Sequence, residues 1–201
     1  MAKIITIAHQ KGGVGKSTLA INIALCFKDQ LSVALVDTDL QGSLYHIRGE
    51  FPELAIISSD SFDDIEKLAY DLIIIDTPPY LSSRLPDLFR LSDFILVPTK
   101  AGFFDVMAIR STIAMIDDAM KAVPDIKAGI VLNMVKPRSG ITNEVAELIR
   151  TMDVALLNTI IHDRVSIARS AMTSGILQST DQKARDEITA LAEEVVDMIS
   201  A

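Results

Sequence analysis

Residues 11–18 read Lys11-Gly-Gly-Val-Gly-Lys-Ser-Thr18, and they follow directly on the apolar run Lys3-Ile-Ile-Thr-Ile-Ala8. An apolar run, a glycine-rich turn and then Lys-Ser/Thr form the pattern of a strand, a phosphate-binding loop and a helix. In such a loop, a tight turn points successive backbone N–H groups inward, where they hold phosphate oxygens. Glycines at positions 12, 13 and 15 permit positive φ and a close approach of the ligand. The stretch therefore predicts a nucleotide phosphate site after the first strand.

The side chains of this loop have separate expected roles. We expect Lys16 to reach the β- and γ-phosphates and Ser17 to give its hydroxyl to Mg²⁺, at the positive end of the following helix. The usual pattern is G-x-x-x-x-G-K-[ST], but Gln10 takes the place of the first glycine and Lys11 stands beside it. The loop is therefore a deviant member of its class. Its expected nucleotide contacts are Gly12, Gly13, Val14, Gly15, Lys16, Ser17 and Thr18.

Two other interpretations of the same residues are weaker. One is an ordinary strand-to-helix loop. The other is the dinucleotide fingerprint G-x-G-x-x-G, half-matched by Gly13-Val-Gly15-Lys-Ser-Thr18, with Asp37 as the ribose-binding acid. This fingerprint fails at Thr18, where the third glycine belongs, and it leaves the adjacent lysine and serine without a role.

Composition narrows the class of protein. The chain has 201 residues, of which 49% are hydrophobic and 23% charged, as in soluble globular proteins, and we expect one domain over 1–201. No apolar stretch approaches the roughly 20 residues of a membrane span, and we expect no signal peptide. The single cysteine, Cys26, excludes an internal disulfide framework and suits a reducing cytoplasm. A net charge of −8 argues against a wholly basic nucleic-acid binder, but not against a local basic patch.

Short apolar runs alternate with longer amphipathic segments along the chain. This alternation predicts an α/β fold, a mostly parallel twisted sheet with helices on both faces. Together with the phosphate loop at residues 11–18, it predicts the P-loop NTPase type. The runs Leu72-Ile-Ile-Ile75 and Phe94-Ile-Leu-Val97 are apolar at consecutive positions, which is typical of strands buried on both faces. We expect strands at 3–8, 32–37, 54–58, 71–76, 93–98, 127–132 and 154–160, and helices at 16–28, 61–69, 84–91, 105–122, 141–151, 164–173 and 183–199.

Three carboxylates are expected near the phosphate loop. Ligand chemistry in open α/β sheets gathers beyond the carboxyl ends of the strands. Asp76 follows four apolar residues, as does the strand-end carboxylate that holds Mg²⁺ in P-loop enzymes. Asp37 and Asp39 end the second expected strand and would add two carboxylates near the same cation. A single acid after a strand is often a turn residue, but three beside one phosphate loop favour a metal site.

This constellation resembles the deviant-Walker ATPases, the ParA/MinD family that also includes the nitrogenase iron protein. The resemblance is carried by Lys11–Thr18, by Asp37-Thr-Asp39-Leu-Gln-Gly42 and by Asp76-Thr-Pro-Pro79. Residues 163–175 look like the C-terminal region of ParA proteins. One departure is Leu40, where partition proteins usually have proline, and it leaves the local loop shape open.

The resemblance implies a role for each matching residue. Lys11 would reach across an ATP-dependent homodimer to the other subunit's phosphates, and Asp39 would orient the attacking water. Asn133, after an expected strand, would contact adenine. The implied catalytic residues are thus Lys11, Lys16 and Asp39, and the implied Mg²⁺ residues are Ser17, Asp37 and Asp76. Because Lys11 would act on the partner's site, all the positive charges that stabilise the phosphates would be present only in the ATP-bound dimer. The resemblance therefore implies a slow ATPase switch that a partner stimulates.

Three branches of the family remain to be weighed. An iron protein needs several cysteines for its cluster, and Cys26 alone excludes it. A MinD-like membrane switch needs a basic amphipathic tail, whereas residues 186–199 are amphipathic but acidic, so no membrane partner is expected. The remaining branch is a short ParA-type partition ATPase without an N-terminal helix-turn-helix domain, cytoplasmic and nucleoid-associated.

Such a protein would bind DNA without sequence specificity and position cargo through a separate centromere-binding or cargo adaptor. The cargo, whether plasmid, chromosome origin or protein cluster, stays open. A MinD-like membrane-associated positioning ATPase and a weakly catalytic ATP-driven regulatory switch remain as alternatives. The candidate DNA contacts, which would neutralise phosphates, are Arg164, Arg169, Lys183 and Arg185, with Lys136 and Arg138 as outliers.

Overall fold

Seven parallel strands form one sheet in the order β3-β2-β4-β1-β5-β6-β7 in the computed structural model. The structure describes residues 2–39, 43–59, 62–80, 82–137 and 140–200. The central strand β1 therefore lies between β4 and β5. The strands are β1 (Lys3–Ile7), β2 (Val33–Asp37), β3 (Ala55–Ser58), β4 (Leu72–Asp76), β5 (Phe94–Thr99), β6 (Lys127–Val135) and β7 (Ala155–His162).

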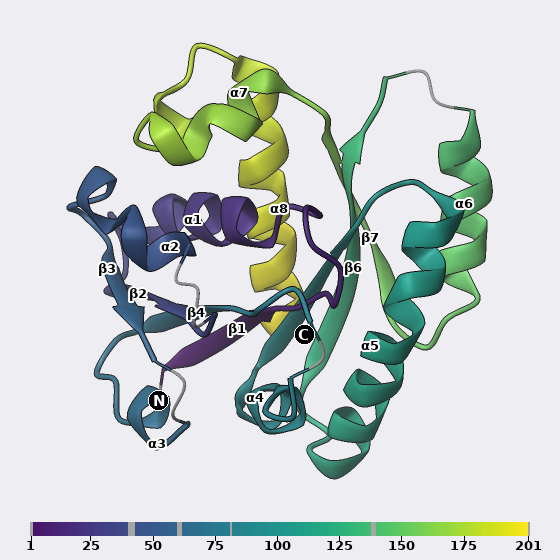
Figure 1. Ribbon diagram of the computed structural model, residues 1–201, viewed down its shortest axis with the longest axis horizontal. Coiled ribbons are helices and arrows are strands. Elements are labelled where there is room, and N and C mark those ends of the chain that lie inside the picture. Colours follow the sequence, from purple (N-terminus) through teal and green to yellow (C-terminus); the bar gives the residue numbers. More distant parts are fainter. Residues whose placement is uncertain (1, 40–42, 60–61, 81, 138–139, 201) are drawn as a thin grey trace.

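Helices cover both faces of the sheet (Figure 1). One face carries α1 (Lys16–Phe27), α2 (Ser43–His46), α7 (Val165–Arg169) and α8 (Gln182–Ser200). The other face carries α3 (Phe62–Glu66), α4 (Leu85–Leu91), α5 (Phe103–Ala122) and α6 (Ile141–Arg150). Among the described residues, no helix combines the length and the apolar character needed to cross a membrane.

The alternation of side chains along each strand divides the core between these two layers. In β4, Leu72 and Ile74 pack under α1 and α8, whereas Ile73 and Ile75 pack under α3 and α4. Every residue of β4 is buried, which is why its sequence is a continuous apolar run. Each fully buried Ile or Leu contributes about 1.5–3 kcal/mol, so the apolar runs direct both layers onto the sheet.

The predicted fold class is confirmed, and the seven expected strands are present within a few residues of their bounds. The helix expected at 164–173 is instead the five-residue α7 followed by a 3₁₀ turn, Ser170–Met172. Asn22 accounts for this break. Its amide nitrogen donates to Ser170 Oγ at 2.7 Å, and its oxygen accepts the Ile176 N–H at 2.7 Å. These bonds, from a fully buried side chain, hold a turn at Gly175, whose φ is 88°.

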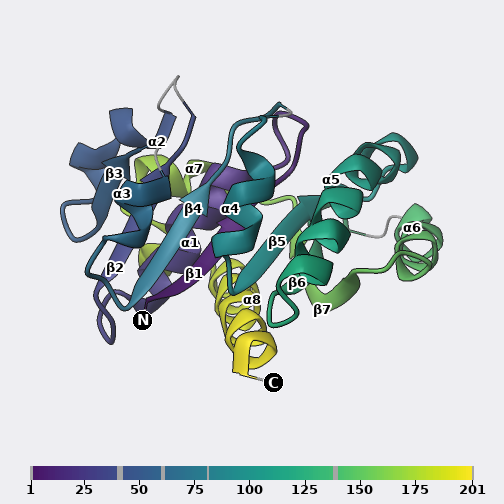
Figure 2. The ribbon, with the colours of Figure 1, turned by 90° about the horizontal axis from the view of Figure 1, so that it is seen from below.

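The register of the central strands places the predicted site residues side by side at the carboxyl ends of those strands. Asp37 at the end of β2 and Ile7 at the end of β1 each pair with Asp76 at the end of β4. Because all three strands run in the same direction, the loops that follow them emerge at one edge of the sheet. Figure 2 shows the purple loop after β1 beside the teal loop after β4. The predicted site residues are therefore brought together by strand register.

Candidate nucleotide site

The glycine-rich loop links β1 to α1, and its backbone has the special geometry that the sequence predicts. Gly13 has φ of 70° and Gly15 has φ of 91°, in the left-handed region that favours glycine. The helix α1 begins at Lys16, directly after the loop. A cavity of about 310 Å³ lies at this point, lined by Gly12, Gly13, Gly15, Lys16, Ser17, Thr18, Asp39, Asp76, Thr77, Pro79 and Met134.

Asn133 at the end of β6 supports the loop from behind. Its amide nitrogen donates to the Val14 carbonyl at 2.7 Å, and its oxygen accepts the Met134 N–H at 2.9 Å. A Cβ at Gly15 would lie 2.4 Å from this amide nitrogen, so the contact requires glycine there. Asn133 thus positions the phosphate loop in this structure, and its predicted contact with adenine stays a prediction.

Met134 lines the cavity, and the sequence reasoning missed it. Its φ of 54° is rare for a residue other than glycine. The strand pairing between β6 and β7 shifts register in the same stretch. Neither feature leaves a signal in the sequence.

Lys16 is the buried cation of the site. Its residue is only 7% exposed, and burial lowers the pKa of its ammonium, while the nearby carboxylates of Asp76 and Asp39 act in the opposite direction. A buried ammonium needs an anionic partner. Nucleotide phosphate in the adjoining cavity would supply it.

Ser17 and Asp76 form a pair that fits Mg²⁺. The Ser17 hydroxyl donates to Asp76 Oδ2 at 2.5 Å. The other oxygen, Oδ1, is buried without a hydrogen-bond partner among the described residues. Burial raises the pKa of Asp76 to about 7, against the hydrogen bond from Ser17 and the charge of Lys16. An unsatisfied carboxylate oxygen beside a hydroxyl matches the oxygen ligands that Mg²⁺ prefers, with phosphate oxygens and water completing the shell.

Asp37 and Asp39 follow β2, but they are placed differently. The buried Asp37 carboxylate accepts the N–H of Asp39 at 3.0 Å and the N–H groups of Leu44 and Tyr45 at 3.0 and 3.1 Å. It therefore holds the start of α2, and its support of the Mg²⁺ shell stays a prediction. Asp39 lines the cavity, as its predicted role requires. The next three residues of that motif, Leu40, Gln41 and Gly42, lie outside the described residues.

Lys11 is held by the first turn of α5. Its ammonium lies 2.5 Å from Asp105 Oδ1, and it does not line the cavity of its own chain. A second link joins the same loop to the same helix, because the Ser111 hydroxyl donates to Gln10 Oε1 at 2.9 Å. The sequence reasoning missed Asp105, since an acid in the first turn of a helix is explained by the helix dipole alone.

His9 precedes these residues and lies beneath them. Its Nδ1 accepts the Lys11 N–H at 2.8 Å. Burial lowers the pKa of His9 to about 4, and the charge of Lys16 acts in the same direction. The imidazole is therefore neutral at pH 7 and fixes the direction of the loop backbone.

The four residues predicted to contact DNA differ in their surroundings. Arg164 is only partly exposed, and its guanidinium lies 2.7 Å from Glu187 Oε1, which also contacts His162. Arg185 is half-buried and donates to Gln182. Arg169 and Lys183 are exposed, as is the outlier Lys136. Arg138 lies outside the described residues.

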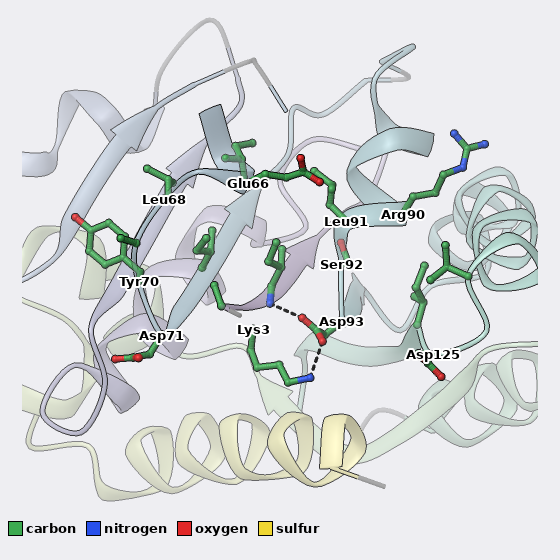
Figure 3. Close-up of a pocket in the computed structure, with 17 residues that line it drawn as sticks. Lys3, Glu66, Leu68, Tyr70, Asp71, Arg90, Leu91, Ser92, Asp93 and Asp125 are labelled. Carbon is green, nitrogen blue, oxygen red and sulfur yellow. Dashed lines mark hydrogen bonds and ion pairs between the residues drawn. The ribbon is translucent and has the colours of Figure 1, made fainter. Parts of the chain in front are cut away.

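A larger hollow of about 940 Å³ lies at the opposite edge of the sheet (Figure 3). Its lining includes the starts of β1 and β4, and its carboxylates outnumber its cations. Lys3 is paired with Asp93 at 2.6 Å, and Asp71 accepts the N–H and hydroxyl of Ser32. A net acidic lining without a glycine loop does not suit phosphates, so the smaller cavity is the nucleotide candidate.

Comparison with known proteins agrees with this assignment. Residues 5–175 match the family model described as the CobQ/CobB/MinD/ParA nucleotide binding domain. A relative in Halothiobacillus neapolitanus, maintenance of carboxysome distribution protein A, is 32% identical over 207 residues, covering 96% of this chain and 95% of the relative.

Two solved structures share the fold. A plasmid partition protein of Borrelia burgdorferi, bound to AMPPNP, has a TM-score of 0.72 at 20% identity, with 100% and 99% of the two chains covered. The septum site-determining protein MinD of Pyrococcus horikoshii, complexed with Mg-ADP, has a TM-score of 0.71 at 21% identity, with 100% and 98% covered. With the family model matching most of its length, and with the phosphate loop and strand-end carboxylates in place, this chain belongs to the ParA/MinD nucleotide-binding family.

Proposed function

We propose that this protein is a Mg²⁺-dependent ATPase that dimerises on ATP and positions a cargo. The observation that carries the ATPase proposal is the Ser17–Asp76 pair beside the buried Lys16, at the mouth of a glycine-lined cavity. The two fold neighbours with AMPPNP and Mg-ADP support the choice of ligand.

We expect the loop N–H groups and Lys16 to bind the phosphates of ATP, while Ser17 and Asp76 would hold Mg²⁺. An ion held there would supply positive charge to offset the charge of the phosphates. Asp39, at the wall of the cavity, orients the attacking water. Phosphoryl transfer depends mainly on positioning and charge stabilisation, which these fixed groups supply.

Lys11 would complete the site from a second subunit. Its position outside its own cavity, on the rim formed with α5, supports action in trans. Loss of the γ-phosphate would then remove the reason for pairing, so that hydrolysis times the life of the dimer. An adaptor that stimulates hydrolysis would shorten that life.

The dimer would hold non-specific DNA, placing the protein on the nucleoid, and an adaptor would link it to cargo. Among possible cargoes, a large protein assembly is favoured by the relative that distributes carboxysomes. The MinD-like membrane alternative is disfavoured, because Ile188, Leu191 and Val195 on the apolar face of α8 are buried in the core.

The test is ATP turnover, measured alone, with DNA, with the adaptor encoded nearby, and with both. We expect slow basal turnover that rises with DNA and adaptor together. The variant Asp39→Ala should still form ATP-dependent dimers but should not hydrolyse ATP. Normal hydrolysis by Asp39→Ala would refute its water-orienting role. No turnover under any condition, with DNA binding intact, would instead support the regulatory switch.

A further inference from the structure

The segment that leads from β7 into α8 carries local positive charge. The whole chain has a net charge of −8, but residues 162–185 contain four Arg and Lys residues and only two Asp residues. A local excess of cations on an acidic protein favours an anionic partner. The phosphates of DNA are the anions that the proposed function brings to this segment.

At the start of this segment, one carboxylate is shared by two basic side chains. Glu187 of α8 accepts the backbone N–H of His162 at 3.0 Å, and its Oε1 lies 2.8 Å from His162 Nδ1. The same carboxylate accepts hydrogen bonds from Arg164 Nη2 at 2.7 Å and from Nε at 3.2 Å. Figure 1 shows β7 ending beside the first turns of α8, just before α7. The three side chains are partly open to solvent, with exposed fractions of 34% for His162, 23% for Arg164 and 15% for Glu187.

The charge of Glu187 settles how His162 bonds to it. Burial raises the pKa of Glu187, but the hydrogen bonds from Arg164 and His162 outweigh burial and hold this pKa below its usual value. The carboxylate is therefore ionised near neutral pH and only accepts hydrogen bonds, so His162 Nδ1 carries the hydrogen of their contact. The other ring nitrogen, Nε2, has no hydrogen-bond partner among the described residues. It is therefore open to take up a proton.

A proton on His162 changes the charge balance of this cluster. The elements around His162 bring Glu187 from α8, Arg164 from the start of α7, and Lys136, which follows the β6 residue paired with His162. Asp163 comes next in the chain and is exposed. With His162 neutral, Glu187 compensates Arg164. With His162 charged, the single carboxylate faces two cations, and one positive charge is left uncompensated.

We infer that His162 is a proton-operated switch that frees the charge of Arg164 for a DNA phosphate. The inference rests on the proposed DNA binding and adds pH as its regulator. Arg164 Nη1 has no hydrogen-bond partner among the residues that the structure describes, so it can reach a phosphate while Glu187 still holds Nε and Nη2. Histidine is the side chain that most often changes its charge between about pH 5 and pH 8.

The experiment measures the binding of a fluorescein-labelled duplex of random sequence by anisotropy, with AMPPNP and Mg²⁺, at about pH 5.5 and about pH 8. We expect wild type to bind about 3–10-fold more tightly at the lower pH, because binding then takes up a proton. The slope of log affinity against log salt should be steeper there by about 0.9, as for one further phosphate contact. His162→Gln cannot take up the proton, and its slope should be the same at both pH values.

His46→Gln is the matched control for the loss of a histidine. His46 is exposed on α2, which follows β2 near the opposite end of the sheet from β7. This variant should keep the pH dependence and the salt slopes of wild type.

Glu187→Gln tests the shared carboxylate separately. The substitution removes the negative charge but keeps an amide oxygen that can accept the His162 N–H. We expect this variant to bind DNA more tightly than wild type at about pH 8, because Arg164 is then uncompensated without a proton on His162. An unchanged circular dichroism spectrum would show that α8 is still folded. An affinity no higher than that of wild type would overturn the role given to Glu187.

The remaining outcomes separate this inference from the proposed function. If His162→Gln keeps the pH dependence and salt slopes of wild type, the inference is overturned and the proposed DNA binding stands. A wild type that binds no DNA at either pH overturns both. If His162→Gln loses the pH dependence of binding to polyglutamate but not to DNA, DNA is overturned as the partner of this switch, and an acidic protein takes its place.

Discussion

Lys16 is the buried cation of the nucleotide site, and we expect ATP binding to depend on it. Its ammonium is buried beside Asp76 and Asp39, and burial lowers its pKa. We predict that Lys16→Ala abolishes detectable binding of a fluorescent ATP analogue in a titration, because no other side chain of the loop brings a cation into the cavity. Lys121→Ala, at an exposed pair with Asp117, is the control and should bind normally. Unchanged affinity of Lys16→Ala would refute the phosphate site.

The Lys11–Asp105 pair predicts a change in chemical reactivity. Asp105→Asn removes the anion that holds the Lys11 ammonium at 2.5 Å. Because partly exposed ion pairs contribute roughly 0–1 kcal/mol, we expect acetylation of Lys11 to become a few-fold faster, as followed by mass spectrometry of the nucleotide-free protein. Asp117→Asn should accelerate acetylation of Lys121 and leave Lys11 unchanged. Equal rates for Lys11 in wild type and Asp105→Asn would contradict the pairing.

Asp76 predicts a dependence of stability on pH in protein free of nucleotide and metal. Burial raises its pKa from 3.8 to about 7, so the folded state binds the proton more tightly than the unfolded chain. This contribution to stability is fully present below about pH 4 and is lost as the pH rises to about 7, a change of roughly 4 kcal/mol. We therefore expect Asp76→Asn to gain stability relative to wild type across this range in urea unfolding with EDTA.

His9 makes the free energy of unfolding change with pH in the opposite direction, so its contribution must be separated from that of Asp76. Burial lowers the pKa of His9 to about 4, so its contribution is present above pH 6.5 and is lost as the pH falls through 4. Because wild type and Asp76→Asn share His9, its contribution largely cancels in their difference. A difference in unfolding free energy that does not vary with pH would contradict the raised pKa of Asp76.

At the scale of elements, the contact of Arg164, which follows β7, with Glu187 in α8 determines which substitutions can test DNA binding. Arg164→Glu would place a carboxylate against Glu187, so loss of DNA binding could follow from a disturbed packing of α8 on β7. Arg169 and Lys183 are exposed, and their replacement avoids this problem.

We predict that Arg169→Glu combined with Lys183→Glu weakens DNA binding in fluorescence anisotropy. The slope of log affinity against log salt should become shallower by about 0.9 for each lost phosphate contact. Arg150→Glu with Lys121→Glu is the control, because it reverses the same number of charges on α6 and α5, which cover the opposite face of the sheet from α7 and α8. If both double variants weaken DNA binding equally, the loss would reflect the change in net charge and not a local DNA contact.

At the scale of the whole molecule, ligand binding to the folded state alone must raise its stability. AMPPNP with Mg²⁺ at a hundred times its dissociation constant should add about 2.7 kcal/mol. For a chain of this length, that corresponds to a rise in Tm of roughly 5–10 °C in a thermal scan. Chelation of Mg²⁺ should remove much of the rise, and Ser17→Ala should show a smaller one. A rise that does not depend on Mg²⁺ would contradict the role of Ser17 and Asp76.

The arrangement of layers was predictable because it depends on patterns local in the chain. Parallel strands buried on both faces must be apolar at every position, and β4 is such a run. The break between α7 and the following turn was not predictable, because Asn22 imposes it from a helix about 150 residues earlier.

The sequence by itself determined the phosphate loop, the strand-end carboxylates and the order of strands and helices. Glycine spacing and apolar periodicity act over a few residues, and they are therefore visible in the chain. Only the tertiary structure decided that Asp105 pairs with Lys11, that Asn133 holds the loop at Val14, and that Glu187 pairs with Arg164. These contacts join residues far apart in sequence. They form because strand register and helix packing place the partners at one edge, which no local pattern encodes.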